Sequence, residues 1–140
     1  MTPFQQVRSL GGPSPIGIAT MPPGDSAAPG QVEFTTPSTT NWTVPEGVTA
    51  ISMVTVGGGG GGSWCQGYGE QSGAGGGGGG LSWRNNYGVS PGQIMEVTVA
   101  PGGAGGQQSG GADGAWGGDS WITNEATGAL VCVGEGGNGG

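Results

Sequence analysis

Few side chains in this sequence could carry out acid, base or metal chemistry. It contains no histidine, which excludes a Ser-His-Asp arrangement and an imidazole metal site. Asp113 and Asp119 come nearest to a pair of catalytic carboxylates, but the glycines around them favour turn and capping roles. Together with Glu125 and Glu135 they lack the spacing of a calcium-binding loop. The sequence therefore predicts no catalytic residue, no metal and no cofactor, and we expect a protein that is not an enzyme.

The two cysteines are the only thiols. Cys65 and Cys132 could form one disulfide bond, or both could be buried free thiols. Their spacing does not decide between these alternatives.

Aromatic side chains are the remaining candidates for ligand binding. Five of them could stack on sugar rings: Trp64, Tyr68, Trp83, Tyr87 and Trp116. Trp64 and Tyr68 belong to the segment 63–72, which we expect to be an exposed loop. All five could equally be core or lid residues, and for Trp83, which lies close to Leu81, a core position is favoured. Trp64, Tyr68 and Trp116 are therefore the candidate glycan-binding residues.

The elements that would position these side chains are organised around the stretch 49–62. In the segment 49–56, Ile51 and Met53 fall on one face of an extended strand and Val54 and Val56 on the other, which predicts a strand with at least one buried face. This strand runs directly into six glycines, 57–62. The same pairing of an apolar segment with a glycine tract returns at 75–83, 97–106 and 131–140.

The glycine tracts have no side chains to bury, so nothing prevents another backbone from lying directly against them. A tract could be a flexible linker, a continuation of the strand, or an extended polyproline II helix. In the polyproline II form every amide and carbonyl group needs a partner outside its own segment, and tracts that pack side by side can satisfy one another. The entropic cost of fixing glycine favours loose loops instead, and the sequence leaves both alternatives open.

Short alternating segments predict the remaining strands at 31–36, 41–44, 94–99, 119–123 and 129–133, while 81–89 follows a glycine tract. The sequence Ser90-Pro91-Gly92-Gln93 predicts a turn in which Gly92 has a positive φ, and a second turn is expected at 124–128. About seven short strands without a helix are typical of an all-β fold, here a small β-sandwich or jelly-roll-like domain over residues 31–140.

Composition indicates an ordered domain with a small core. The 140 residues include 38 glycines and 10 prolines, a level typical of low-complexity chains. Disorder normally also requires a high charge, whereas only 8% of these residues are charged, and five tryptophans favour apolar packing.

The charge excludes two classes of partner. The net charge is -7, and Arg8 and Arg84 are the only cations. Nucleic acids and anionic membranes both require cationic surfaces, so we expect neither as a partner. The first twenty residues lack an apolar run, so we expect no signal peptide and no transmembrane helix.

Residues 1–30 differ in composition from the rest of the chain. They are rich in proline, and we expect an extended arm that cannot sustain a helix or a long strand. The arm could be a disordered leader or an anchoring segment that orders against a partner. Six scattered apolar residues are the candidate contacts: Phe4, Val7, Leu10, Ile16, Ile18 and Met21.

Several ordered blocks of the sequence resemble the glycine-rich domain of bacteriophage tail fibres and related virion appendages. These blocks are 34–49, the tracts 57–62 and 75–81, the turn 89–93 and the segment 97–106, so the resemblance covers about residues 31–140. It implies a virion protein whose glycine-rich module stands out from the particle, commonly as a homotrimer, without catalytic residues. The chain is short for a complete fibre and stops inside a glycine tract, and the sequence leaves open whether the natural polypeptide continues past Gly140.

Two hypotheses follow from the residues and the resemblance. In the first, the protein is a structural component of the virion, and residues 1–30, which begin at Met1, attach it to a capsid, collar or tail protein. In the alternative, the domain is a receptor-binding adhesin that recognises a host surface glycan through its loop aromatics.

Overall fold

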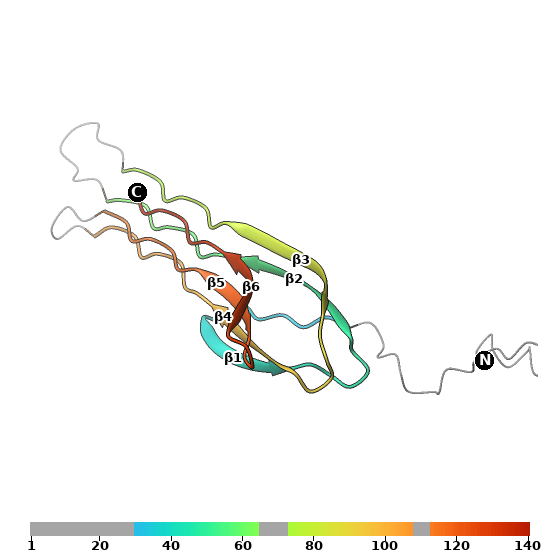
Figure 1. Cartoon of the computed structure of the whole chain (residues 1–140). Helices are drawn as coiled ribbons and strands as arrows, with labels where there is room; N and C mark the ends of the chain where they lie inside the picture. Colours follow the sequence, from blue (N-terminus) through green and yellow to red (C-terminus); the bar gives the residue numbers. More distant parts are fainter. Residues whose placement is uncertain (1–29, 65–72, 108–112) are drawn as a thin grey trace, which may run out of the picture.

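The computed structural model describes residues 30–64, 73–107 and 113–140 (Figure 1). These residues form six strands: β1 (Ser38–Thr43), β2 (Ala50–Val56), β3 (Leu81–Gly88), β4 (Ile94–Val99), β5 (Ser120–Asn124) and β6 (Ala129–Gly134). One antiparallel sheet has the order β1-β4-β5-β6, and β2 and β3 form a second antiparallel sheet. The predicted small, all-β sandwich is thus confirmed. Within the described ranges, no helix has the length and apolar composition that crossing a bilayer would require.

The predicted strand at 31–36 is wrong. Residues 30–37 form no strand, and β1 begins at Ser38. The reason is the partner strand: β1 pairs with β4 from Ser38 opposite Val99 onwards, and the hydroxyl groups of Thr39 and Thr98 are hydrogen-bonded at 2.9 Å. The alternation of side chains alone does not reveal where a partner strand ends.

The core is small and lies between the two sheets. The buried residues that form it are Val44, Met53, Val89, Met95, Val131 and Cys132, with Trp42, Val48, Ile51, Tyr87 and Ile122 packed against them. Met95 is fully buried, at 0% exposure. In β2, Met53 and Thr55 are buried whereas Val54 and Val56 are exposed, which confirms the predicted one-sided strand.

Both predicted turns form. Gly92 has a φ of 80°, and the amide of Gln93 donates to the carbonyl of Ser90 at 3.0 Å. Between β5 and β6, the amide of Gly128 donates to the carbonyl of Asn124 at 2.8 Å, with Gly128 at a φ of 65°. Glycine is favoured at these two positions because a side chain would be strained there.

Five glycine-rich tracts extend from the strands and lie side by side in the described structure (Figure 1). They are tract A (57–64, after β2), tract B (73–80, before β3), tract C (100–107, after β4), tract D (113–119, before β5) and tract E (135–140, after β6). Their backbones are joined by hydrogen bonds with N···O distances of 2.7–3.0 Å. The tracts are therefore ordered by one another and are not loose loops.

Tract A is the centre of this polyglycine bundle. Its amides follow a three-residue repeat, in which Gly57, Gly60 and Ser63 donate to tract B and Gly58 and Gly61 donate to tract D. Its carbonyl groups accept amides from tracts C and E. A repeat of three residues with bonds only to neighbouring chains is the pattern of packed polyproline II helices. The strands β2 to β6 deliver all five tracts to the same end of the molecule.

Only hydrogen fits between the central backbone and its neighbours. A Cβ on Gly60 would overlap the carbonyl oxygen of Asn138, and a Cβ on Gly61 would overlap that of Ala104. Because both obstacles are backbone atoms, they cannot rotate away as a side chain would. The absence of side chains is thus a packing requirement here.

Tract D was not predicted from the sequence, because residues other than glycine interrupt it. The signal lies in its spacing: Gly114 and Gly117 are three residues apart, and a Cβ on either would overlap a carbonyl oxygen of tract A. Asp113, Trp116 and Asp119 occupy the positions that point outward and are exposed. Glycine at every third residue is therefore a second signal for such a tract, besides a run of consecutive glycines.

We predict that Gly60→Ala destabilises the protein by ~1–3 kcal/mol or more, because the added methyl group overpacks the bundle. Gly105→Ala is the matched control within the bundle, since a Cβ there would meet only the carbonyl oxygen of Gly62, at 3.7 Å. This control should be neutral or stabilising by about 0.4–1 kcal/mol. Denaturant unfolding measures both, and equal stabilities would contradict the packed bundle.

We also predict that amide hydrogen exchange differs within the polyglycine tracts. The amide of Gly61, which is buried and donates to Ala115 at 2.8 Å, should exchange slowly. The amide of Gly105, which is exposed and has no backbone acceptor in the described ranges, should exchange at close to the rate of an unstructured peptide. Exchange followed by nuclear magnetic resonance tests this, and fast exchange at Gly61 would mean that the tracts are not packed in solution.

Candidate functional site

The polyglycine bundle has one open side along tract A. In the described structure, the amides of Gly59 and Gly62 donate to no backbone carbonyl. Gly59 is exposed, and a Cβ there would have only the carbonyl oxygen of Gly77 within 4 Å, at 3.6 Å. Tracts B, E, D and C follow one another around tract A through hydrogen bonds, but none of the described hydrogen bonds joins B to C. Tract A is thus uncovered between tracts B and C.

The outward positions of the tracts fall into two kinds. Tracts D and E carry polar or large side chains there, as at Trp116, Glu135 and Asn138, which are all exposed. Tract B carries glycine, and a Cβ on Gly75 or Gly78 would meet no atom within 4 Å. The described fold therefore leaves room for a side chain at these two glycines.

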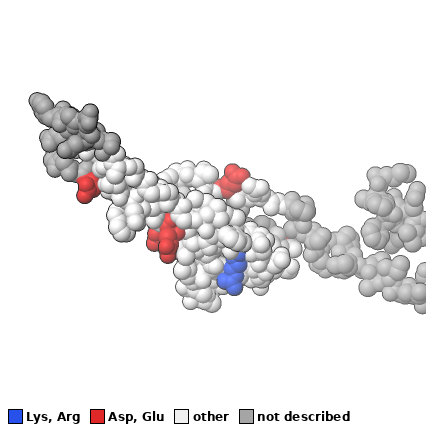
Figure 2. Space-filling view, turned by 90° about the horizontal axis from the view of Figure 1, so that it is seen from above, with Lys and Arg blue, Asp and Glu red and all other residues white. Residues whose placement is uncertain are grey.

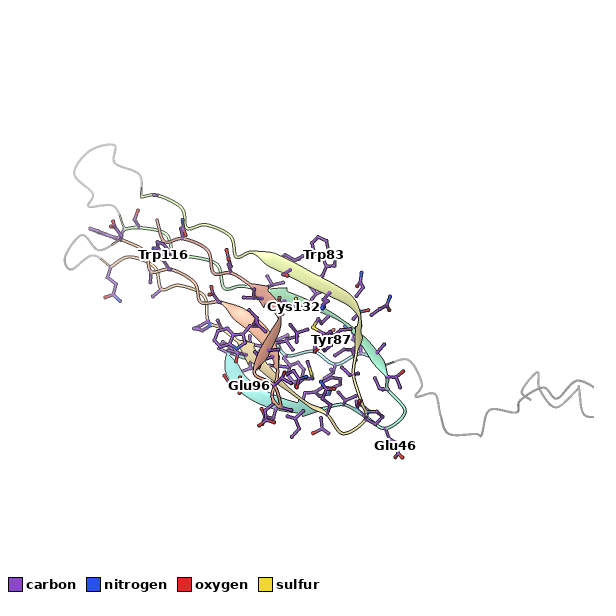
Figure 3. All side chains as sticks on the ribbon, viewed as in Figure 1. Glu46, Trp83, Tyr87, Glu96, Trp116 and Cys132 are labelled. Atoms are coloured by element: carbon purple, nitrogen blue, oxygen red, sulfur yellow. The ribbon has the colours of Figure 1, made fainter. Side chains whose placement is uncertain are left out.

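An exposed apolar patch lies on the outer face of the β2–β3 sheet, where these tracts begin. It consists of Val54, Val56, Leu81 and Trp83, each between 56% and 65% exposed. Val54 pairs with Trp83 and Val56 pairs with Leu81, so the four side chains are adjacent on one face. We call this group the outer patch. Figure 3 shows Trp83 projecting from β3 away from the sandwich.

The favoured core position of Trp83 is therefore wrong. The register places Trp83 opposite Val54, whose face is exposed because its neighbours Met53 and Thr55 point into the core. Tyr87, in the same strand, packs against the core instead. The pairing register of β3 shifts between Trp83 and Tyr87. Asn86 adopts a positive φ of 53° at this shift, which moves the side chains that follow to the other face of the strand.

The ring of Tyr87 is already in contact with another side chain of the protein, that of Arg84. The guanidinium carbon of Arg84 lies 5.0 Å from the centre of its ring, and an Arg84 nitrogen donates to the carbonyl oxygen of Val131 at 3.4 Å. This side chain of β3 therefore belongs to the framework and is a weak candidate for stacking on a sugar.

The candidate glycan-binding residues are separated in the structure. Trp64 is half-buried at the far end of tract A, whereas Trp116 is 73% exposed on tract D (Figure 3). Tyr68 lies outside the described residues. Trp64 shares the three-residue repeat of tract A with Gly58 and Gly61, and a Cβ at either glycine would meet tract C. Trp116 instead points outward from tract D. The described structure thus offers Trp116 as the exposed aromatic of the bundle.

Several other predicted residues also fall outside the described ranges. These are the six apolar residues of the arm, Phe4, Val7, Leu10, Ile16, Ile18 and Met21, and Cys65. Cys132 is described: it is a buried free thiol, with its sulfur 3.3 Å from the hydroxyl oxygen of Thr55 and 3.5 Å from that of Ser82. The thiol therefore joins the two sheets through polar contacts.

Asp113 and Asp119 do not form a pair of catalytic carboxylates. They lie on one tract, and six residues of a polyproline II helix span about 19 Å, whereas a glycosidase pair is about 5–9.5 Å apart. Asp119 instead accepts a hydrogen bond from the amide of Gly136 at 2.7 Å and so connects tract D to tract E. Within the described ranges, no three His, Cys, Asp or Glu side chains come together as a metal site.

A cleft of about 1160 Å³ lies beside β2, bounded by the four-stranded sheet and the segment 30–35. Apolar side chains such as Met53, Met95 and Ile122 line much of it, and Glu33 is the only ionisable group among its lining residues. A single carboxylate cannot supply a general acid and a general base together. The cleft therefore offers no acid–base pair.

Charge is sparse on the surface of the described part. Figure 2 shows separate acidic groups on a mainly uncharged body, with Arg84 as its one cation. The acidic residues of the described ranges are Glu33, Glu46, Glu96, Asp113, Asp119, Glu125 and Glu135. None of them lies on β2, β3 or tracts A, B and C.

Comparison with known proteins matches the chain to a family of domains. No curated protein and no solved structure matches the chain. The glycine-rich domain family matches residues 35–140, which include all six strands and all five tracts. The chain therefore belongs to the glycine-rich domain family.

Proposed function

We propose that this protein is a structural component of a bacteriophage particle, in which residues 1–30 attach it to a capsid, collar or tail protein and the glycine-rich β domain projects outward. The observation that carries this proposal is the polyglycine bundle. Its tracts are held by backbone hydrogen bonds along their length, so the described residues form an extended, densely bonded body. Such a body suits a projecting part better than a catalytic one.

The bundle can stand away from the particle without a large core. Tract A alone spans about 25 Å at the rise of a polyproline II helix. Its backbone groups are satisfied mainly by other tracts, so the extension does not depend on burying apolar side chains. A module of this kind reaches outward with few residues.

The arrangement along the molecule supports attachment at one end and exposure at the other. The segment 30–37, blue to cyan in Figure 1, begins at the strand end of the molecule, and the tracts extend from the opposite end. An arm that precedes residue 31 would thus leave the bundle free. The resemblance to phage appendages adds that several copies act together, commonly three, and that the protein is not an enzyme.

A receptor-binding role is the second candidate, and the exposure of Trp116 favours it. This indole is 73% exposed on tract D, on the bundle that would point away from the particle. A large exposed aromatic side chain offers an apolar surface on which a sugar ring of a host glycan can stack. In this alternative the bundle presents the binding residue instead of serving only as a spacer.

We predict that deleting residues 1–30 removes the protein from virions without unfolding the domain, because β1 to β6 and the five tracts all lie after residue 30. Purified particles assembled with the truncated protein should contain at least about tenfold less of it, as measured by quantitative immunoblotting. Circular dichroism of the isolated truncated chain provides the folding control. Normal incorporation of a folded truncated chain would contradict the anchoring role.

For the adhesin alternative, we predict that Trp116→Ala reduces adsorption of particles to host cells, because stacking on the sugar is lost. Leu130→Ala is the control, since Leu130 is also exposed but lies on β6 at the strand end. Adsorption rates of particles with equal protein content give the comparison. If Trp116→Ala and the double variant Trp64→Ala/Tyr68→Ala both adsorb like the parent, the adhesin role at these aromatics is wrong.

A further inference from the structure

The outer patch and the open side of tract A form one continuous surface that the described fold leaves uncovered. Val56 directly precedes tract A, and Leu81 directly follows tract B. The strand part of this surface is apolar, and the tract part is bare backbone. Exposed apolar groups of adjacent side chains mark interaction sites more often than isolated ones do.

The tract part carries unpaired backbone amides. In the described ranges, the amides of Gly59 and Gly62 lack a backbone acceptor. Groups three residues apart on such a tract repeat about every 9 Å. A partner that pairs with them must therefore be an extended chain with the same repeat.

The glycines at this surface indicate how closely that partner approaches. Gly75 and Gly78 face open space, so the fold of one copy gives no reason for the absence of a side chain there. Glycine is entropically costly to order, and its use at a position with free space is explained when another backbone lies against it. The outward positions of tracts D and E, which carry Trp116 and Glu135, show that the tracts accept side chains elsewhere.

We infer that this surface binds the same surface of a second copy of this chain. The match is chemical: the outer patch of one copy would cover that of the other, and the free amides of tract A would donate to backbone carbonyl oxygens of a second polyglycine layer. The two faces would bury Trp83, an aromatic side chain of the type that dominates interface energetics. The copies would then share one larger polyglycine bundle.

The distribution of charge selects a second copy over a different partner. The chain has a net charge of -7, so two copies repel each other at most orientations. Within the described ranges no acidic residue belongs to β2, β3 or tracts A, B and C, although Glu135 borders tract B at Gly80, so this face opposes few carboxylates when two copies meet. A basic partner would instead be attracted to the acidic surfaces.

This inference deepens the proposed function only in naming the surface through which copies associate, and it can fail independently of any role in a virion. The test uses the purified full chain and measures its mass by sedimentation over a range of concentrations. The 13.4 kDa chain should form a dimer, because a surface that binds its own counterpart is satisfied by two copies. Trp83→Glu should weaken this association about tenfold or more, because each copy would bury a carboxylate.

Two further variants distinguish the surface from general effects. Trp116→Glu places the same charge at another exposed tryptophan, on tract D, and should leave the association unchanged. Gly59→Leu fills the open side of tract A and should weaken the association while the isolated domain keeps its circular dichroism spectrum. The amide of Gly59 should exchange slowly in the assembled parent and rapidly in Trp83→Glu. A parent chain that stays monomeric, or an association that Trp83→Glu and Gly59→Leu both leave intact, would overturn the inference.

Discussion

The short distance between neighbouring backbones determines how the tracts of this protein pack and form hydrogen bonds. Tracts A to E lie so close that a carbonyl oxygen occupies the place where a Cβ would be, as between Gly60 and Asn138. At that distance the amides of one tract reach the carbonyls of the next, at 2.7–3.0 Å, and the chain satisfies its polar groups without forming a helix or a strand ladder. Hydrogen bonding and close contact thus replace much of the stabilisation that apolar side chains provide elsewhere.

The β-sandwich sets the geometry for these contacts. Each tract continues a strand or leads into one, so the order and direction of the strands determine which tracts become neighbours. The small core, with Met95 at its centre, needs only to hold the two sheets in register. Fixing a glycine backbone is entropically expensive, and this cost is offset when five tracts order one another cooperatively. Framework and bundle are therefore interdependent.

The sequence predicted the parts of the fold that have a local signal. Alternation identified β2 and β4, and the Pro91–Gly92 turn and the consecutive glycines were equally informative. The sequence did not predict features that depend on a distant partner, such as the start of β1 at Ser38 or the register that exposes Trp83. The sequence did not predict tract D, because larger residues interrupt its glycines. Of the candidate site, Trp116 was a candidate binding residue whose exposure the sequence left open, and the outer patch depends on pairing that no local pattern reveals.

The three-residue repeat of tract D separates what the fold requires from what the surface displays. Gly114 and Gly117 cannot be replaced without a clash, but outward positions of the same tract hold Asp113, Trp116 and Asp119. Asp119 accepts a hydrogen bond from the amide of Gly136, whereas Asp113 and Trp116 project into solvent, so substitutions at these two positions would leave the architecture intact. A rigid scaffold with a row of freely exchangeable positions about 9 Å apart can diversify rapidly under selection without first acquiring compensating changes.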